Sequence, residues 1–292
     1  MITHPDKMLF PDDGITKGEL ADYYAAVAPV MLPHVRRRLI TMERYPNGIG
    51  AKGFIQKDVS KGFPAWLKRI EAPKKGGVVH YPLANDARSL AWFANQNTIT
   101  LHVWPSRAPR IERPDVCVFD LDPSREDAET LRTAMLELRA VLDELGHPSW
   151  VKTSGSKGFH VVVRLTARAT FARSSALADE VADQLVSRQP KIFTRAFAKA
   201  DREERIYLDT ARNRAGATFA ATYTVRARPG APVSAPCTWE EVASGEVHPR
   251  SFTLRTMAAR LERVGDLWAG LVPARAPSRP GRREVRPSSA SA

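Results

Sequence analysis

Apolar residues recur every three or four positions in the segments 17–32, 86–96, 126–145 and 173–187. This spacing places them on one face of an α-helix, so each segment is predicted to be helical. The first helix begins with a capping box, in which the Thr16 hydroxyl and the Glu19 carboxylate each bind a backbone N–H at the helix start. Gly146 follows the third helix at the position that favours a left-handed backbone. Two further capped helices are expected to begin near Thr238 and Ser251.

Shorter runs rich in β-branched and aromatic residues predict strands at 39–45, 99–104, 115–122, 150–153, 159–165, 205–209 and 217–226. A short turn containing glycine separates the fourth run from the fifth, which favours a hairpin. The stretch from Gly48 to Gly62 is polar and rich in glycine, and it presents Phe54 as an exposed aromatic residue. Because strands and helices are mixed without a regular βαβ alternation, the predicted fold class is α+β rather than a doubly wound parallel sheet.

The length of 292 residues and the apolar content of 43% provide enough material for a packed core. We expect one domain over residues 1–272 and a disordered basic tail rich in Pro, Arg and Ser over residues 273–292. The net charge is +12, and the tail holds five arginines against one glutamate, so the domain itself remains strongly basic. This excess favours a polyanionic partner, although a chain from a GC-rich genome can be rich in arginine without binding nucleic acid.

The chain has two cysteines, Cys117 in a predicted strand and Cys237 in a proline-rich loop, which provide neither a disulfide framework nor a zinc site. No apolar stretch approaches the roughly 20 residues that cross a membrane, and residues 1–7 lack the apolar core of a signal peptide. We therefore expect a cytoplasmic, nucleoid-associated protein without membrane contact.

The segment 116–123 ends an apolar run with two carboxylates, Asp120 and Asp122. Residues two apart project from the same face of a strand, roughly 6–7 Å from each other. Two such oxygen ligands suit Mg²⁺ or Mn²⁺ in phosphoryl transfer. An Asx-turn that leaves the strand and caps the next helix is the alternative explanation. A third acid, Asp209, closes the apolar run 206–208 and favours the metal site.

The turn 153–160 is rich in Gly and Ser and carries Ser154, Lys157 and His160. It has neither the spacing of a P-loop nor that of a dinucleotide fingerprint. Small residues let backbone N–H groups approach anionic oxygens, and Lys157 adds a point charge, so the turn is a candidate phosphate cradle. The alternatives are a flexible hairpin tip and, for His160, a structural histidine in a strand.

Taken together, Asp120-x-Asp122, the motif from Ser154 to His160 and Asp209 resemble the three motifs of archaeo-eukaryotic primases, and most closely those of the polymerase domain of bacterial DNA ligase D. The similarity covers roughly residues 4–265. It includes further segments at 6–11, 16–17, 45–48, 101–103, 119–123 and 223–233.

This resemblance implies a catalytic core related to the RNA-recognition fold, with a second α/β subdomain around it. It implies template-directed nucleotide addition with Mn²⁺ or Mg²⁺ in a two-metal site, with preference for ribonucleotides. The substrates implied are nucleoside triphosphates and DNA with gaps, recessed ends or double-strand breaks, as in non-homologous end joining. Ku and a separate DNA ligase are the implied protein partners, and a monomer is the default state.

The resemblance also implies roles for individual residues. The metal ligands would be Asp120, Asp122 and Asp209. The incoming nucleotide would contact His102, Ser154, Lys157, His160 and Arg226. The 5′-phosphate of the downstream strand would contact Lys7 and Lys17. The template would contact Phe54, Lys57 and Arg202. For Arg226, a salt bridge on a strand is the alternative, but its pairing with Arg228 before a Pro-Gly turn favours a polyanion.

Lys7 and Lys17 lie on either side of the turn 10–14, so the chain reversal can bring both ammonium groups together. Lys17 also opens the first helix, where free backbone N–H groups and the positive end of the helix dipole are expected to favour a phosphate. The alternative is that both are solvated surface lysines.

The chain departs from ligase D in lacking the Lys-x-Asp-Gly motif of the ligase and in leaving no room for a phosphoesterase domain, so we expect a stand-alone polymerase. His4 stands where relatives often have Asn, and Arg212 stands where some have Gln. A metal-dependent nuclease using the same acids and a non-catalytic nucleic-acid-binding module remain as alternative functions. A nuclease needs no triphosphate pocket, and a silent module gains nothing from clustered carboxylates that repel nucleic acid.

Overall fold

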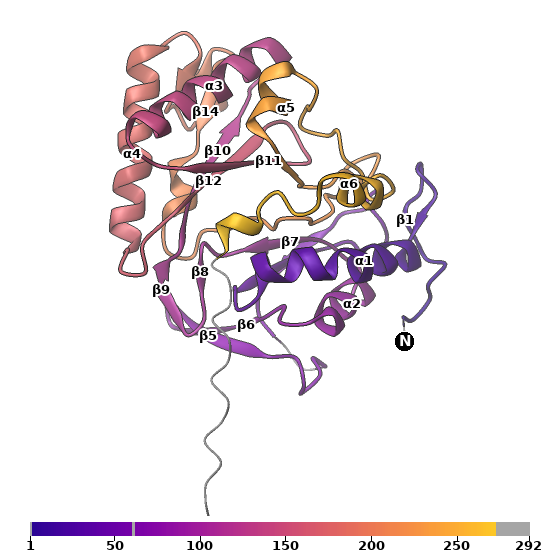
Figure 1. Ribbon diagram of the computed structural model, residues 1–292. Helices are drawn as coiled ribbons and strands as arrows, with labels where there is room; N and C mark the ends of the chain where they lie inside the picture. The colour runs from indigo at the N-terminus through magenta and orange to yellow at the C-terminus, as the bar shows by residue number, and fades with distance from the viewer. Residues whose placement is uncertain (1, 60–61, 273–292) are drawn as a thin grey trace, which may run out of the picture.

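The computed structural model describes residues 2–59 and 62–272, and it is built around two main sheets (Figure 1). The larger has the strand order β13-β14-β10-β12-β11-β16, and the smaller has the order β15-β7-β3-β4. Three two-stranded ribbons, β1–β2, β5–β6 and β8–β9, complete the strands of the described residues. The two main sheets lie in different halves of the molecule, and the segment after β15 runs between them (Figure 1).

The larger sheet is antiparallel except for the parallel pair β13–β14. Its strands in chain order are β10 (Val116–Asp122), β11 (Ser149–Thr153), β12 (Phe159–Arg164), β13 (Phe193–Thr194), β14 (Ile206–Leu208) and β16 (Pro236–Cys237). The helices α3 (Ala128–Glu144) and α4 (Phe171–Arg188) cover one face, and α5 (Trp239–Ser244) packs beside α3 (Figure 1). The Cys117 thiol on β10 lies 3.6 Å from the Ser174 carbonyl on α4, so alternate residues of β10 point away from this helical layer.

The smaller sheet consists of β3 (Ile40–Arg44), β4 (Phe54–Gln56), β7 (Thr98–Val103) and β15 (Phe219–Ala220). The helices α1 (Lys17–Val35) and α2 (Ala87–Asn95) pack against each other beside it. The Tyr24 hydroxyl on α1 donates to the Ile99 carbonyl on β7 at 2.7 Å, which fixes the helix to the sheet. The ribbons are β1 (Met8–Phe10) with β2 (Ile15–Thr16), β5 (Arg69–Lys74) with β6 (Gly77–Pro82), and β8 (Ser106–Arg107) with β9 (Arg110–Pro114).

Helix α1 continues to Val35 although Pro29 and Pro33 each remove a backbone donor. Its capping box is formed as predicted, with the Thr16 hydroxyl accepting from the backbone N–H of Glu19. One face is buried in the main core along the whole helix, and this packing stabilises a helix that proline would otherwise end. The buried apolar residues of this face are Leu20, Tyr23, Tyr24, Val27, Met31 and Val35.

The α+β class is confirmed, and the four long helices lie within a few residues of their predicted bounds. Two predictions are wrong. The last helix, α6 (Met257–Val264), begins after Thr256 rather than near Ser251. The predicted strand 217–226 is interrupted, because the chain turns at Tyr223, whose φ is 67°: Phe219–Ala220 form β15, and Val225 makes an isolated antiparallel bridge with Val233. The expected tail 273–292 lies outside the described residues.

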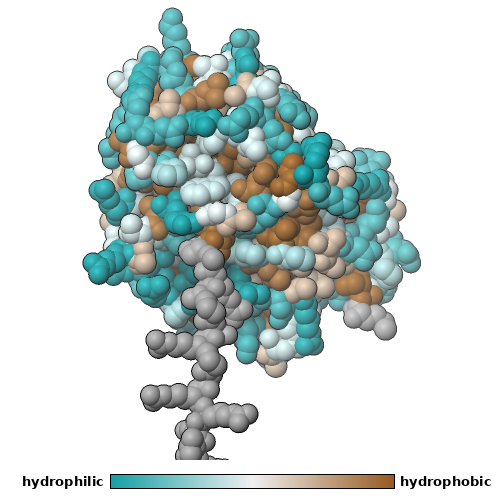
Figure 2. Space-filling view, in the orientation of Figure 1, coloured by the Kyte–Doolittle hydropathy of each residue, from teal (hydrophilic) through white to brown (hydrophobic). Residues whose placement is uncertain are grey.

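No helix in the described part of the chain is long and apolar enough to cross a membrane. In the orientation of Figure 1 the visible surface is largely hydrophilic, with a hydrophobic area near its centre (Figure 2).

Candidate active site

Three polar residues lie side by side across the larger sheet, on the face turned away from α4. Asp120 on β10 is directly opposite His160 on β12, and His160 is directly opposite Lys152 on β11. Residues opposite each other in antiparallel strands share a face, so the three side chains project together. The imidazole Nε2 of His160 lies 3.5 Å from Asp120 Oδ1. Asp122, two residues beyond Asp120, belongs to the same face of β10 by its position, but its side chain lies outside the description.

Asp209 follows β14 and caps the short 3₁₀ helix Thr210–Asn213, with its Oδ1 accepting from the backbone N–H of Ala211 at 3.1 Å. Its own N–H donates to the Asp120 carbonyl at 3.3 Å, so the two predicted acids are neighbours. The guanidinium of Arg212 joins them, with Nε 3.2 Å from Asp120 Oδ2 and 3.0 Å from Asp209 Oδ2. The structure therefore brings together two acids that are 89 positions apart in the sequence.

The donor set at this point fits a hard divalent cation. The Asp120 and Asp209 side chains are each 17% exposed, so they are accessible while partly shielded from water. Paired carboxylates of this kind are typical ligands of Mg²⁺ and Mn²⁺. Among the side chains that the structure describes, no group of three or more His, Cys, Asp or Glu is placed to hold a metal ion. The predicted third ligand is Asp122, whose backbone the sheet places beside the other two.

A second polar group comes from the smaller sheet. His102 on β7 lies 3.4 Å from Glu43 on β3, and the Tyr45 hydroxyl donates to the other oxygen of Glu43 at 2.8 Å. Burial opposes ionisation of Glu43, but the hydrogen bonds from His102 and Tyr45 and the charge of Arg226 prevail and lower its pKa to about 2. Burial lowers the pKa of His102 despite the nearby Glu43 carboxylate. Glu43 and Tyr45 were not predicted, because the pairing that brings them to His102 is not visible in the sequence.

The turn between β11 and β12 is fixed by its own hydrogen bonds. The Ser154 hydroxyl accepts from the N–H groups of Ser156 and Gly158 at 3.1 and 3.2 Å, and Gly155 N–H donates to the Pro249 carbonyl at 3.0 Å. These three N–H groups therefore have partners within the protein, and the phosphate cradle stays a prediction that depends on the other groups of the turn. Lys157 is exposed at the tip of the turn.

Arg226 connects the turn to the rest of the site. Its Nη1 donates to the Ser154 carbonyl at 2.7 Å, while its Nε is buried without a hydrogen-bond partner among the described residues. Burial lowers the pKa of Arg226, and the charges of Glu43 and Asp120 act in the opposite direction. The Nδ1 of His160 is likewise buried and unpartnered in this part of the chain. Buried polar atoms without partners are uncommon, and two of those in the described residues belong to this site.

Lys152 is fully buried behind His160 and was not predicted as a site residue. Its ammonium donates to the Ala220 carbonyl at 2.7 Å and to the Ser234 hydroxyl, and it lies 5.8 Å from the centre of the Phe219 ring. Phe219 and Ala220 form β15, so Lys152 joins the larger sheet to the smaller one. Burial lowers the pKa of Lys152 well below its ordinary value. The signal in the sequence was a lysine inside an apolar strand.

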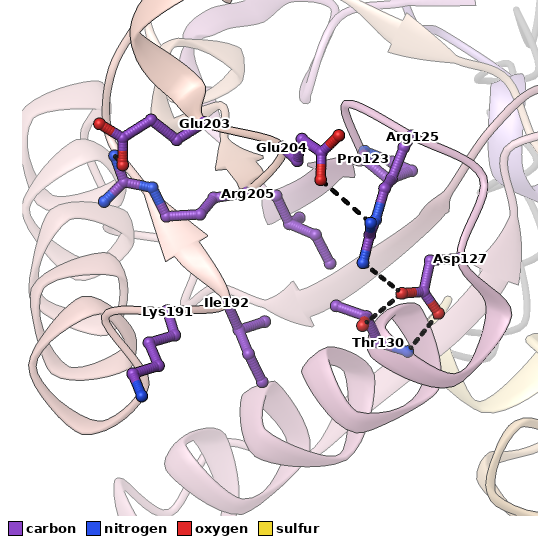
Figure 3. Close-up of a pocket in the computed structure, with 10 residues that line it drawn as sticks. Pro123, Arg125, Asp127, Thr130, Lys191, Ile192, Glu203, Glu204 and Arg205 are labelled. Atoms are coloured by element: carbon purple, nitrogen blue, oxygen red, sulfur yellow. Dashed lines mark hydrogen bonds and ion pairs between the residues drawn. The ribbon is translucent and has the colours of Figure 1, made fainter.

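The loops that flank the acids are tied to each other beside a pocket of about 210 Å³ (Figure 3). Arg125 follows Asp122 closely in the sequence, and its guanidinium lies 3.0 Å from both Glu204 and Asp127. The Ser124 hydroxyl donates to the Arg205 carbonyl at 2.8 Å. These contacts join the segment after β10 to the segment before β14, and they help to hold the two acidic strand ends in register.

Lys7 and Lys17 are brought together, as the chain reversal predicted. The backbone N–H of Lys17 donates to the Lys7 carbonyl at 2.8 Å, and burial with the charge of Lys7 lowers the pKa of Lys17. The Lys17 ammonium also donates to Thr3 Oγ1 at 3.2 Å and to the Asn95 carbonyl at 3.3 Å, so it is not a solvated lysine. The expectation of free N–H groups at this helix start is wrong.

Those N–H groups are already used. Lys17 N–H binds Lys7, Gly18 N–H donates to the Pro5 carbonyl at 2.8 Å, and Glu19 N–H donates to Thr16 Oγ1 at 3.2 Å. Any anion held here is therefore bound mainly by the two ammonium groups.

The three residues expected to contact a template differ in exposure. Phe54 is 46% exposed on β4, the edge strand of the smaller sheet, and Lys57 is exposed just beyond it. Arg202 is 6% exposed, and its guanidinium donates to the carbonyls of Ala196 and Phe197 and lies 4.2 Å from the Tyr207 ring centre. Arg202 thus supports its own loop, and it offers a template little surface.

Comparison with known proteins gives a consistent result. A family model described as LigD, primase-polymerase domain, matches residues 16–268. The multifunctional non-homologous end joining protein LigD of Mycolicibacterium smegmatis is 37% identical over 278 residues, covering 92% of this chain and 36% of that protein. The bifunctional protein LigD of Bacillus subtilis is 30% identical over 265 residues, covering 90% of this chain and 42% of that protein. The chain spans less than half the length of these curated relatives.

Among solved structures, the polymerase domain from Mycobacterium tuberculosis ligase D in complex with DNA superposes with a TM-score of 0.88 at 32% identity. The match covers 93% of this chain and 97% of that domain. The similarity therefore extends over both sheets and the face between them.

Proposed function

The chain belongs to the LigD primase-polymerase family and is a nucleotidyltransferase, and from this premise we propose that it extends the 3′ ends of DNA primers under the direction of a template. Its substrates are nucleoside triphosphates and DNA with gaps, recessed ends or breaks. The observation that carries the proposal is the pairing of Asp120 with Asp209 beside His160, together with His102 on the smaller sheet and Arg226 in the segment after β15. A site that must hold both a cation and a triphosphate needs acids and bases facing each other in this way.

Asp120, Asp122 and Asp209 would hold the divalent cations, Mn²⁺ or Mg²⁺. When bound, two such ions lower the pKa of the primer 3′-hydroxyl and neutralise the triphosphate. The preference for ribonucleotides and the two-metal arrangement are part of the proposal.

The side chains opposite the acids would bind the incoming nucleotide. Lys157 is exposed at the turn and can reach an anion as a point charge. Arg226 Nε, a donor, and His160 Nδ1, a donor or an acceptor, have no hydrogen-bond partner among the described residues and would be available to the nucleotide. Ser154 holds the turn itself, so its role would be to position Lys157 rather than to donate to phosphate. His102, fixed by Glu43, would face the sugar or the phosphates.

The DNA would follow the basic and aromatic residues outside this centre. Lys7 and Lys17 form a compact pair of positive charges suited to the 5′-phosphate of a downstream strand. Phe54 offers an exposed ring on which a template base can stack, with Lys57 beside it. The net charge of +12 supports a polyanionic partner, and a related polymerase domain is known in complex with DNA.

We further propose that the protein acts in non-homologous end joining, since the relatives bear that name. Ku and a DNA ligase activity would then be its partners, and it would work in the cytoplasm at the nucleoid as a monomer.

A primer-extension assay tests the proposal. With Mn²⁺ and a gapped template, the protein should add complementary nucleotides to a labelled primer, and ATP should give a higher kcat/KM than dATP, because a site that bonds the 2′-hydroxyl penalises its absence. Shortening of the primer would indicate the nuclease, and binding without extension would indicate a silent module. Equal or better use of dATP would remove the ribonucleotide preference and leave the polymerase assignment in place.

A further inference from the structure

Arg212 occupies the centre of the acidic site. Its Nε donates to Asp120 Oδ2 at 3.2 Å and forms an ion pair with Asp209 Oδ2 at 3.0 Å, so one nitrogen contacts two carboxylates. Both oxygens are among the atoms that would bind a metal ion. The guanidinium therefore offsets the negative charge of the two carboxylates, and it contacts the same oxygen atoms that would bind the metal ion.

Two carboxylates this close repel each other unless a cation lies between them. Arg212 places its guanidinium, the cationic group of arginine, against both Asp120 and Asp209. In the metal-free protein it is thus the side chain in contact with both acids that neutralises them.

The attachment of Arg212 is compatible with release. Its side chain is 40% exposed, and the hydrogen bond that Nη1 donates to the Thr218 carbonyl is long at 3.3 Å. The residue belongs to the 3₁₀ helix Thr210–Asn213, whose Asn213 side chain is anchored to the backbone of Val118 at 2.8 and 2.7 Å. The backbone is fixed while the guanidinium can move aside.

We propose that Arg212 is an internal cation that holds Asp120 and Asp209 together before metal binds, and that an entering divalent ion must displace its guanidinium from their oxygens. This inference rests on the proposed assignment of the two acids as metal ligands. Arg212 consequently weakens metal binding and stabilises the metal-free site. It is a positioning residue for the ligands rather than a catalytic residue.

Mn²⁺ binding measured by calorimetry, without nucleotide or DNA, tests this directly. Arg212→Gln removes the competing charge and should tighten Mn²⁺ binding roughly three- to tenfold, the order expected for one partly exposed charge beside a dication. Arg212→Lys keeps the charge and should stay closer to wild type. Arg214→Gln is the matched control, because Arg214 is exposed two residues away and its loss changes the net charge equally.

Thermal unfolding in EDTA supplies a second readout. Arg212→Gln should unfold at a lower temperature than Arg214→Gln, and Mn²⁺ should raise its unfolding temperature more than that of wild type. Equal or weaker Mn²⁺ binding by Arg212→Gln, relative to Arg214→Gln, would overturn the inference while leaving the metal site intact. Asp120→Asn tests the assignment of the metal ligands on which this inference rests. If this variant binds Mn²⁺ as tightly as wild type does, both the assignment and the inference are wrong.

Discussion

At the scale of single residues, the site is defined by charged groups that the fold removes from water. Glu43 stays ionised because His102 and Tyr45 donate to it, and Lys152 is held between two sheets by a carbonyl and a hydroxyl. Buried polar groups of this kind are costly when a partner is lost. Removing a hydrogen-bond partner of Glu43 or Lys152 is therefore expected both to destabilise the protein and to disturb the geometry of the site.

Glu43 should make stability depend on pH. Its pKa is about 2 in the folded protein, against an ordinary value of 4.5, so its contribution is complete above about pH 4.5 and is lost as the pH falls toward 2. Glu43→Gln should reduce the free energy of unfolding at pH 7 by about 1–3 kcal/mol. Urea denaturation at pH 7 and pH 3 measures this, and the difference between variant and wild type should shrink at pH 3.

The exposed Glu262→Gln serves as the control and should change little at either pH. If Glu43→Gln lowers the free energy of unfolding by the same amount at both pH values, the ionised Glu43 carboxylate is not the source of the stabilisation.

Lys7 and Lys17 should give a preference for DNA with a downstream 5′-phosphate. In fluorescence anisotropy, wild type should bind the phosphorylated gapped substrate about tenfold more tightly than its 5′-hydroxyl counterpart, a difference that falls as salt rises. Lys7→Gln with Lys17→Gln removes both charges and should abolish the preference. The exposed pair Lys68→Gln with Lys191→Gln should keep it. Identical affinities of wild type for the two substrates would refute the phosphate pocket.

At the scale of elements, the turn between β11 and β12 packs closely against the end of β10 at Gly158. A Cβ atom on Gly158 would lie 2.0 Å from the Leu121 carbonyl oxygen and 3.2 Å from Pro123. Leu121 lies between Asp120 and Asp122, so any displacement reaches both acids. Glycine is required here by close approach rather than by its backbone angle.

Gly158→Ala should therefore destabilise the protein by about 1–3 kcal/mol, as overpacking in a dense interior does. It should also reduce primer extension more than this loss of stability explains at 25 °C, where the variant is still folded. Gly270→Ala is the control, since its nearest neighbour would be 3.9 Å away. Wild-type stability and activity in Gly158→Ala would contradict the packing described.

Elements with their own signals were predictable from the sequence, and elements created by distant contacts were not. The capping box, the helical periodicity and the apolar strands at 39–45 and 115–122 are local patterns, and each formed near its predicted bounds. The ribbon β5–β6 was missed because Pro73, Lys74 and two glycines interrupt its apolar alternation. The segment 251–256 looked like a helix start, but Thr253 pairs with Pro232 instead.

The site followed the same rule. Asp120, Asp209 and the turn 153–160 were found because each ends or interrupts a recognisable strand. The contacts of Glu43, Lys152 and Arg212 depend on which strands and loops become neighbours, and a single sequence does not contain that information. The exposure of Phe54 was predicted, whereas the burial of Arg202 depends on how its loop folds back on Tyr207.

At the scale of the whole molecule, the site exists because two sheets face each other. The larger sheet supplies Asp120 and His160, with Asp209 just after its strand β14, and the smaller supplies His102 and Glu43, while Lys152 joins the two sheets. The proposed cation ligands and the proposed nucleotide-binding residues therefore come from both halves of the molecule. The solved structure that this chain resembles over both sheets is a polymerase domain in complex with DNA.

The most direct test of this account compares primer extension with DNA binding in Asp120→Asn. The variant preserves the shape of the side chain but loses its charge, so extension should fall about a hundredfold or more, while affinity for gapped DNA stays within a few-fold of wild type. Asp143→Asn, exposed on α3, should behave as wild type in both assays. Extension by Asp120→Asn at the wild-type rate would contradict the assignment of the facing sheets as a nucleotidyl-transfer site.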